Sequence, residues 1–232
     1  MTSPAKKPSS PAAEPRRRIL LVDDHPFMRA GLAQLIDRQA DMMVCGEAGN
    51  PSEAMQALDH SKPDLVLTDL TMPGRSGLEF IKDIRAAHES VAILVVSMHD
   101  ESVFAERALR AGARGYIMKE AGGENLLTAI RQVLRGDVYV SPRMSARILE
   151  GVAGTRPRGS KSPIEKLTDR EFEVFQLIGQ GKSTRDIAGQ LHLSPKTVDV
   201  HRANIKEKLG LTDVTALIRH AVRWVETQGK DS

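Results

Sequence analysis

The chain has 232 residues, of which 33 are basic and 30 acidic, giving a formal net charge of +3. This length suits two domains of about 100 residues each. The single cysteine, Cys45, excludes an internal disulfide, and no apolar stretch approaches the ~18 residues of a membrane span. We therefore expect a cytoplasmic protein that makes no membrane contact.

Charge is distributed unevenly along the chain. Residues 18–140 carry a net charge of −5, whereas residues 1–17 carry +3 and residues 141–163 carry +4. The acidic part is not expected to bind nucleic acid by charge, while the basic stretch 141–163 is suited to contacting phosphates. The polar start, residues 1–17, lacks the apolar segment of a signal peptide and is predicted to be a disordered tail.

Residues 18–138 alternate short apolar runs with amphipathic segments. Because apolar runs separated by helices favour parallel strands, five such units predict an α/β, doubly wound, five-stranded parallel sheet with helices on both faces. The functional crevice of such a sheet lies at the carboxyl ends of its strands. The predicted strands are 19–22, 43–45, 65–67, 93–96 and 116–118, and the predicted helices are 26–38, 51–60, 77–88, 102–111 and 124–134.

The pattern becomes purely helical in the last third of the chain. Residues 139–163, rich in Gly, Pro, Ser and Arg, are predicted to be a linker with one short helix around residues 144–149. Residues 164–228 predict a small all-α domain of four helices. Their start signals are Thr168 with Glu171 as a capping box, Ser183 as a cap, Ser194 with Pro195, and Thr212.

Polar side chains stand at the ends of four predicted strands. The first strand ends in Asp23 and Asp24, the third in Asp69, the fourth in Ser97, and the fifth reaches Lys119. Three carboxylates brought together repel one another unless a cation is bound, and all-oxygen ligands favour Mg²⁺. A carboxylate held there can attack phosphorus and form an acyl phosphate, which the ammonium and the hydroxyl would stabilise.

Each of these residues also has a purely structural interpretation. Two acids after a strand are usually a solvated turn or a helix cap, Ser97 alone suits a cap, and Tyr116 alone suits a core aromatic. His25 stands where a helix begins, so we interpret it as structural. It is the ordered agreement of five strand-end positions that favours the functional interpretation.

A phosphatase is the first enzyme class to weigh. Haloacid-dehalogenase-like phosphatases also begin with an Asp nucleophile at a strand end, but carry a second Asp two residues later as the general acid. Thr71 occupies that position here. Because no donor would protonate the leaving group, a turnover phosphatase is disfavoured.

The segments VDDHP, PDLVLTDLTMPGRSG, VVSMHD and AGARGYIMKE, in that order, resemble a two-component response-regulator receiver domain over residues 18–138. The resemblance implies that Asp69 is the phosphoacceptor and that Lys119 contacts the phosphoryl group. The Mg²⁺ ligands implied in the same way are Asp23, Asp24, Asp69 and the backbone carbonyl of Thr71.

The resemblance also implies a switch pair, Ser97 and Tyr116. In such a pair the hydroxyl moves toward the phosphoryl group and the ring swings inward behind it. Glu120 departs from the many receivers that have a proline there after a cis peptide bond. Because a cis bond before a residue other than proline costs about 3 kcal/mol, we do not assume one at Lys119-Glu120, and the sequence leaves the isomer open.

The third helix of the C-terminal part has two distinct faces. Val198, Ile205 and Leu209 share an inward face, and a mixed polar face lies opposite. That face suits a DNA groove, although the charge pattern alone fits a solvated helix equally well. The segments LTDRE, GKSTRDIA, LSPKTVDVHRANI and KLGL resemble the LuxR-type helix-turn-helix.

By that resemblance the recognition helix spans about residues 195–208. Asp199 suits only a donor such as the cytosine amino group, or else pairs locally with Arg202, and both alternatives stay open. The base-side candidates are Lys196, Asp199, Val200 and Ala203, and the phosphate-side candidates are Thr197, His201, Arg202 and Lys206. An apolar stripe along the fourth helix is expected partly to cover the core and partly to form a dimer contact: Val214, Leu217, Ile218, Ala221 and Val222.

The two resemblances together identify the chain as a member of the NarL/FixJ family of transcriptional response regulators. The family implies a cytoplasmic, non-enzymatic DNA-binding regulator that a sensor histidine kinase phosphorylates with Mg²⁺. It further implies a homodimer when phosphorylated, inverted half-sites in double-stranded DNA, and RNA polymerase as a candidate partner.

Two other functions remain to be weighed against this one. In a constitutive DNA-binding regulator the receiver would only dock proteins, which the complete set of acids and Lys119 opposes. A scaffold that binds no nucleic acid is opposed by the helix-turn-helix.

Overall fold

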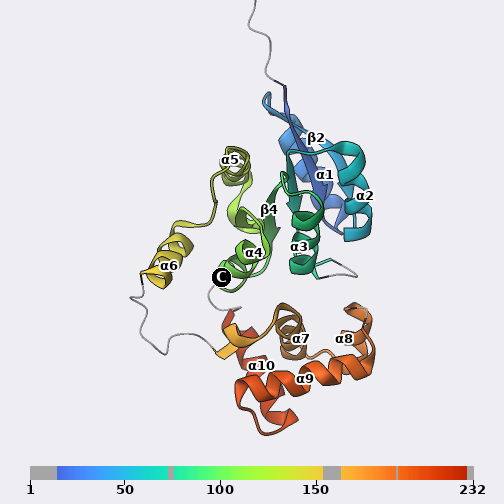
Figure 1. Ribbon diagram of the computed structural model, residues 1–232, viewed down its shortest axis with the longest axis vertical. Helices are drawn as coiled ribbons and strands as arrows, with labels where there is room; N and C mark the ends of the chain where they lie inside the picture. Colours follow the sequence, from blue (N-terminus) through green and yellow to red (C-terminus); the bar gives the residue numbers. More distant parts are fainter. Residues whose placement is uncertain (1–14, 73–75, 154–162, 192, 229–232) are drawn as a thin grey trace, which may run out of the picture.

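A computed structural model describes residues 15–72, 76–153, 163–191 and 193–228. Residues 1–14 of the predicted tail and residues 154–162 of the predicted linker lie outside this range. Figure 1 shows a sheet with its covering helices, followed by a separate group of helices in orange and red. Arg17, assigned from the sequence to the tail, is the first residue of the first strand, and the Arg16 guanidinium donates to the carbonyl of Gln39 at 3.0 Å.

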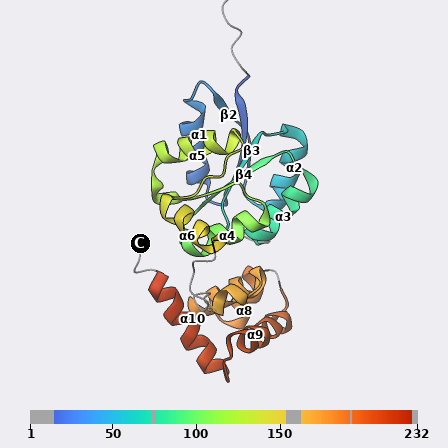
Figure 2. The ribbon, with the colours of Figure 1, turned by 60° about the vertical axis from the view of Figure 1, so that its left-hand side comes forward.

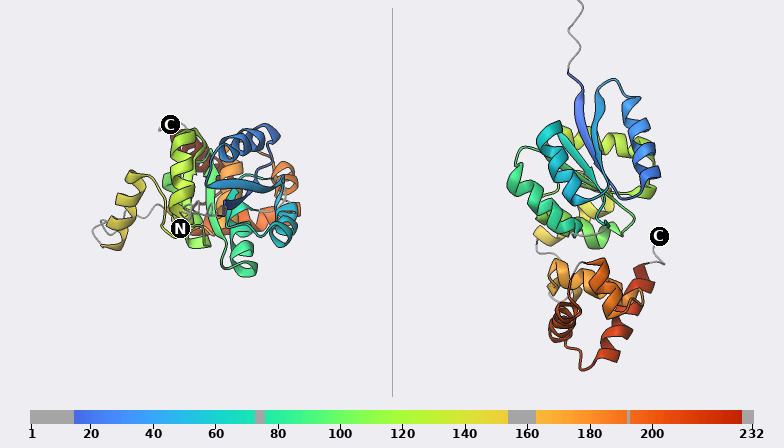
Figure 3. Two further views of the ribbon diagram at one scale, coloured as in Figure 1. Left: turned by 90° about the horizontal axis from the view of Figure 1, so that it is seen from above. Right: turned by 90° about the vertical axis from the view of Figure 1, so that its right-hand side faces the viewer.

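The sheet is parallel throughout, with the strand order β2-β1-β3-β4-β5. The predicted fold class is therefore confirmed. The right-hand view of Figure 3 shows the strands running toward the helical group. The strands are β1 (Arg17–Val22), β2 (Met42–Ala48), β3 (Leu65–Thr68), β4 (Ala92–Ser97) and β5 (Gly115–Met118).

Helices cover both faces of the sheet (Figure 2). On one face, Leu20 and Val66 pack in a core with α2, α3 and α4, while Ile19 and Leu65 face a second core with α1 and α5. The two cores follow from the alternation of side chains along each strand. The helices are α1 (Pro26–Asp37), α2 (Pro51–Ser61), α3 (Gly77–Ala87), α4 (Glu101–Ala111), α5 (Gly123–Leu134) and α6 (Pro142–Val152), with a short 3₁₀ turn η1 (Lys119–Ala121).

Strand β2 is longer than the three residues predicted for it. It pairs with β1 alone, so it is an edge strand, and its pairing shifts register between Ile19 and Leu20 of its neighbour. Most of β2 is only partly buried, and Glu47 is exposed. The apolar run ends at Cys45, and Gly46 and Glu47 follow, so the second half of the strand is not visible as hydrophobic pattern.

The helical group begins with the short turn η2 and continues in four helices, as predicted. Thr168 and Glu171 form the predicted capping box, and Ser183 and Ser194 cap the next two helices. Phe172 and Phe175 are fully buried in the small core, together with Ile205 and Leu217. The elements are η2 (Pro163–Lys166), α7 (Asp169–Gly179), α8 (Thr184–Gln190), α9 (Pro195–Leu209) and α10 (Val214–Gln228).

The sheet part and the helical group contact each other through α4 and α7. The Arg107 guanidinium of α4 donates to the carbonyls of Leu167 and Ile164 at 3.0 Å each, and to Asp169 Oδ1 at 3.1 Å. It also lies over the ring of Phe172, 4.5 Å from the centroid. Lys82 of α3 donates to the other oxygen of Asp169 at 2.7 Å. One arginine thus joins the start of α7 to the sheet part by hydrogen bonds, an ion pair and a cation–π contact.

No helix within the described ranges is long and apolar enough to span a membrane. In the same ranges every peptide bond is trans, including Lys119-Glu120, for which the sequence left the isomer open.

Candidate active site and nucleic-acid interface

The predicted acids and the predicted lysine meet at the carboxyl end of the sheet. Asp23 follows β1, Asp69 follows β3, and both are almost fully buried. The Lys119 ammonium, at the end of β5, donates to Asp23 Oδ2 at 2.6 Å and to Asp69 Oδ2 at 2.7 Å. Burial alone would lower the pKa of Lys119, but its hydrogen bonds to the two carboxylates raise it above the usual value. Lys119 is therefore charged and neutralises part of the acidic cluster.

Backbone amides orient the carboxylate of Asp69. Its Oδ1 accepts hydrogen bonds from the N–H groups of Leu70 at 2.6 Å and Thr71 at 3.2 Å. Its Oδ2 is thereby directed toward Lys119. The two bonds together hold the carboxylate in a fixed orientation, which is what a nucleophile requires.

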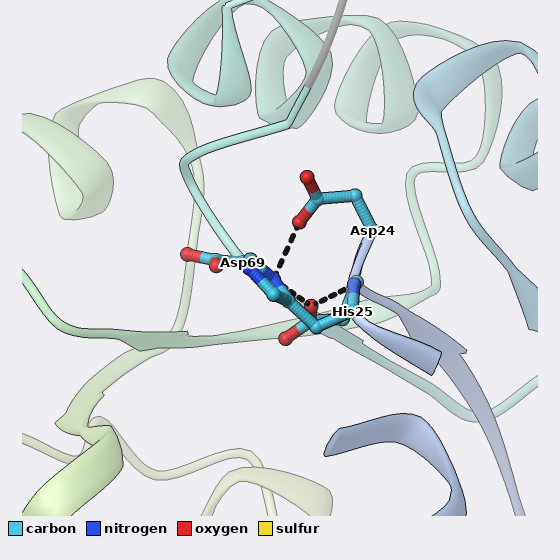
Figure 4. Close-up of side chains that lie close together, drawn as sticks. Asp24, His25 and Asp69 are labelled. Carbon is cyan, nitrogen blue, oxygen red and sulfur yellow. Dashed lines mark hydrogen bonds and ion pairs between the residues drawn. The ribbon is translucent and has the colours of Figure 1, made fainter. Parts of the chain in front are cut away.

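Asp24 and His25 complete the cluster (Figure 4). Ligand atoms of Asp23, Asp24, His25 and Asp69 all lie within 4.8 Å of one another. Asp24 Oδ1 is buried and accepts no hydrogen bond from the described residues, although His25 Nδ1 lies 2.8 Å away. A buried carboxylate oxygen without a donor is costly unless a cation meets it, so the residues present fit Mg²⁺. His25, interpreted from the sequence as structural, belongs to this cluster.

Ser97 and Tyr116 lie fully buried beside the cluster. The Tyr116 hydroxyl donates to the carbonyl of His99 at 2.7 Å, and Ser97 Oγ accepts from the His99 N–H at 3.2 Å. Burial raises the pKa of Tyr116 far above its usual value, although a hydrogen bond with Ser97 opposes this. The ring of the predicted switch pair is therefore already in the inward position in this structure.

Sequence reasoning missed one residue of this region, His99. Its Nε2 lies 2.6 Å from Thr71 Oγ1, and its ring stacks on Phe104 with 4.6 Å between centroids. Burial lowers the pKa of His99 below the usual value, so the imidazole is neutral. Only its position two residues after Ser97 could have drawn attention to it.

The candidate DNA contacts lie on α9, which faces away from the sheet part (Figure 1). Lys196, Asp199, Val200 and Ala203, the base-side candidates, are all exposed. The phosphate-side candidates Thr197, His201, Arg202 and Lys206 are partly buried. Both sets therefore lie on α9, but the base-side candidates are the more accessible.

Two of the partly buried residues make local hydrogen bonds. Arg202 donates to Thr184 Oγ1 of α8 at 2.7 Å, and Thr197 Oγ1 lies 2.8 Å from the capping hydroxyl of Ser194. Burial lowers the pKa of His201, and Arg170 acts in the same direction. Arg202 is thus positioned by α8 and not by the Asp199 pair considered from the sequence.

The apolar stripe of α10 divides into two parts. Leu217 and Ala221 are fully buried in the core of the helical group. Val214 and Ile218 are exposed by 44% and 41%, while Val222 is partly buried. The stripe thus covers the core with one edge and leaves two apolar side chains accessible at the start of α10.

Comparison with known families gives two matches in order along the chain. Residues 19–131 match the family described as "Response regulator receiver domain". Residues 165–221 match the family described as "Bacterial regulatory proteins, luxR family". The two resemblances drawn from the sequence are confirmed.

Individual relatives match over almost the whole chain. The chain is 34% identical to "Oxygen regulatory protein NreC" of Staphylococcus carnosus (strain TM300) over 210 residues, covering 89% of this chain and 97% of the relative. It is 34% identical to "Response regulator GacA" of Pseudomonas aeruginosa over 206 residues, covering 89% and 95% of the two chains.

Solved structures of similar fold are also found. The structure of RcsB from Salmonella enterica serovar Typhimurium, bound to promoter rprA with the phosphomimetic BeF3⁻, has a TM-score of 0.65 at 24% identity, covering 90% of this chain and 99% of RcsB. A LuxR-family two-component response regulator from Aurantimonas sp. SI85-9A1 has a TM-score of 0.56 at 38% identity, covering 60% and 99%. From these matches, the chain belongs to the response regulators of two-component systems, which act with a kinase and bind DNA through a LuxR-type helix-turn-helix to regulate transcription.

Proposed function

We propose that a sensor histidine kinase switches this transcription regulator by Mg²⁺-dependent phosphorylation of Asp69. The proposal assigns phosphoryl acceptance to residues 18–138, DNA binding to residues 164–228, and the connection between them to residues 139–163. The observation that carries it is the buried cluster in which Lys119 bridges Asp23 and Asp69, while Asp24 Oδ1 accepts no hydrogen bond from the residues that the structure describes.

The chemistry is a transfer between two nucleophiles. An oxygen of Asp69 forms a bond to phosphorus while the bond from phosphorus to the donor nitrogen of the kinase histidine breaks. The bonding electron pair stays on that nitrogen, which takes up a proton, and Asp69 becomes a mixed anhydride. Mg²⁺, when bound by Asp23, Asp24, Asp69 and the Thr71 carbonyl, would neutralise charge on the transferred group. Lys119 would then donate to a phosphoryl oxygen in place of Asp69.

Asp69→Asn tests the acceptor. We expect this variant to lose labelling by acetyl phosphate in the presence of Mg²⁺, measured as the loss of the retarded band on a phosphate-affinity gel. Asp59→Asn is the matched control, because Asp59 lies on α2 with its side chain 72% exposed and is expected to leave labelling intact. Labelling that persists in Asp69→Asn would place the acceptor elsewhere.

DNA binding is assigned to α9, with double-stranded DNA as the partner. A dimer joined through Val214 and Ile218 on α10 would present two copies of α9 to inverted half-sites about 10 base pairs apart, centre to centre. Phosphorylation would promote this dimer, and RNA polymerase is a candidate partner at the promoter. The exposed base-side residues of α9 support this assignment.

The double variant Arg202→Ala, Lys206→Ala tests the face of α9. If both cations contact phosphates, the slope of log affinity against log salt should flatten by about two units. Fluorescence anisotropy on labelled genomic fragments measures the slope, and Arg38→Ala, an exposed position at the end of α1, is the control. An unchanged slope in the double variant would contradict the assignment.

A further inference from the structure

His99 lies between the candidate phosphoryl pocket and the helical group. It lies in the segment between β4 and α4, directly after Ser97 and Met98. Thr71, which it contacts, follows Asp69 by two residues and donates its N–H to the Asp69 carboxylate. His99 is thus linked to the acceptor Asp69 through Thr71 and does not contact Asp69 itself.

Three bonds tie His99 to the pocket and its switch pair. Its N–H donates to Ser97 Oγ at 3.2 Å, its carbonyl accepts from the Tyr116 hydroxyl at 2.7 Å, and its Nε2 lies 2.6 Å from Thr71 Oγ1. Backbone and side chain are therefore both fixed by residues of the sheet part. A displacement of Ser97 changes the position of His99 directly.

A fourth bond ties His99 to the helical group. Its Nδ1 lies 3.2 Å from Nε2 of Gln176, on α7. An amide nitrogen can only donate, so Nδ1 accepts this bond and Nε2 carries the proton that it donates to Thr71. A single neutral tautomer thus satisfies both contacts at once.

An aromatic series runs in parallel with this bond. The His99 ring stacks on Phe104 of α4, and Phe104 meets Phe172 of α7 edge to face with 5.1 Å between centroids. Phe172 in turn meets the ring of Trp224 on α10 at 5.4 Å. Trp224 also lines a cavity of about 410 Å³ between the two halves, beside Arg107 and Lys82. A shift of the His99 ring therefore has a direct path of packed side chains into the helical group.

We propose that His99, held by Gln176, is the positioning residue through which the phosphorylation state of Asp69 changes the docking of the DNA-binding domain. The proposal rests on the proposed function, because it needs a phosphoryl group on Asp69. That group adds negative charge where Ser97 Oγ now accepts a hydrogen bond. When the Ser97 side chain rotates and its Oγ moves to donate to a phosphoryl oxygen, the His99 N–H loses its acceptor. The loop then shifts, and the imidazole displaces Gln176 with it.

The coupling is reciprocal by thermodynamic necessity. If phosphorylation of Asp69 weakens the docking of α7 on the sheet part, undocking strengthens phosphorylation by the same factor. Gln176 is the helical-group residue that bonds to His99, and it reaches the pocket through His99. Removing its amide should therefore uncouple docking from phosphorylation while Arg107 still holds the two halves together.

Trp224, the single tryptophan of the chain, provides the measurement. In the wild-type chain, Mg²⁺ with beryllofluoride should open the cavity that Trp224 lines and shift its emission to longer wavelength. In Gln176→Ala, emission should start at the wild-type wavelength and lose this shift, while a phosphate-affinity gel shows that acetyl phosphate still labels Asp69. His99→Ala should lose the shift in the same way. The matched control is Gln56→Ala, an exposed glutamine on α2, which should keep the wild-type shift.

The outcomes separate this link from the proposed function. A wild-type chain that takes no label would refute phosphoryl acceptance. A labelled wild-type chain without a shift, or the full wild-type shift in both Gln176→Ala and His99→Ala, would refute the link alone. Circular dichroism checks that each variant is folded, and a fold lost in His99→Ala leaves Gln176→Ala to decide.

Discussion

Lys119 is the residue on which the charge balance of the acidic cluster depends. It donates to two carboxylates at once, and only 5% of its side chain is exposed. Removing one partner from a buried ion pair leaves uncompensated charge. The three carboxylates can therefore lie close together because the Lys119 ammonium pairs with Asp23 and Asp69, while Asp24 remains available to a bound cation.

Lys119→Met should make the stability of the sheet part depend strongly on Mg²⁺. Without metal we expect a loss of about 3–5 kcal/mol, since two buried carboxylates lose their partner. Adding Mg²⁺ should recover part of it, because an ion that binds only the folded state stabilises by mass action. Urea unfolding at pH 7, with and without Mg²⁺, measures both effects. An equal response to Mg²⁺ in the variant and the wild type would contradict this account.

Glu171 makes the stability of the helical group depend on acid pH. Burial would raise its pKa, but the hydrogen bonds from Lys208 at 2.6 Å and from the Thr168 N–H lower it below the usual 4.5. A lowered folded pKa means that the stabilisation is fully present above pH 4.5 and is lost as pH falls through the lower, folded value.

Glu171→Gln should cost about 1–3 kcal/mol at neutral pH and flatten the loss of stability below pH 4.5. Urea unfolding followed at a series of pH values gives both quantities. Glu226→Gln, exposed on α10, should leave the curve unchanged. A variant with the wild-type slope would show that another group titrates.

Among the elements, α4 determines how the helical group is held. Arg107→Ala removes its hydrogen bonds to η2 and α7 and its contact with Phe172, so the two halves should separate and the radius of gyration from X-ray scattering should rise. Arg110→Ala, on the same helix, is the control. Arg110 pairs with Glu106 within α4 and its side chain is 72% exposed. Equal scattering from the two variants would contradict a docking role for Arg107.

The sequence predicted most elements because their signals are local. Buried strands such as β3 appear as apolar runs, and caps such as Thr168 stand directly before their helices. The edge strand β2 was underestimated, since its apolar run ends at Cys45 and its last residues include Gly46 and the exposed Glu47. The short turn η2 is too short to show a periodic pattern of apolar residues, so the sequence pattern did not predict it.

The acidic cluster was predictable for a topological reason, whereas the contacts around it were not. Parallel strands bring their carboxyl ends together, so acids at strand ends imply proximity. The bonds of His99 to Gln176 and of Arg107 to Asp169 join residues more than 60 positions apart in the sequence. These residues do not stand at neighbouring strand ends of one sheet, so the topology does not bring them together. No periodic or local pattern in a single sequence predicts such pairs, because each of these residues, taken alone, is equally compatible with an exposed surface position.

At the scale of the whole molecule, the docked arrangement leaves α9 accessible. Residues of the sheet part contact η2 and α7 and line the cavity beside Trp224. Helix α9 lies on the side of the helical group that faces away from the sheet part (Figures 1 and 2). The exposed Val214 and Ile218 of α10 are the surface that a second copy could cover. Phosphorylation is therefore expected to act on pairing of two chains more than on uncovering the recognition helix.

Affinity for DNA should separate these two effects. A duplex with one half-site, selected from random sequence, should bind the unphosphorylated chain and the beryllofluoride complex with similar affinity. A duplex with two inverted half-sites should bind the complex more tightly, by about tenfold or more for a coupling above 1.4 kcal/mol. Anisotropy titrations on both duplexes test this. A large gain on the single half-site would show that α9 is covered before phosphorylation.

Strand β3 lies in the middle of the sheet, with β1 on one side and β4 on the other, and all four of its residues are buried. Asp69 thus directly follows a strand that is fully buried and paired on both sides. In deuterium exchange, the amides of β3 should be among the last to exchange with or without a phosphoryl group. Those of residues 98–101 should change their protection, because a rigid support leaves the neighbouring loop to absorb the displacement.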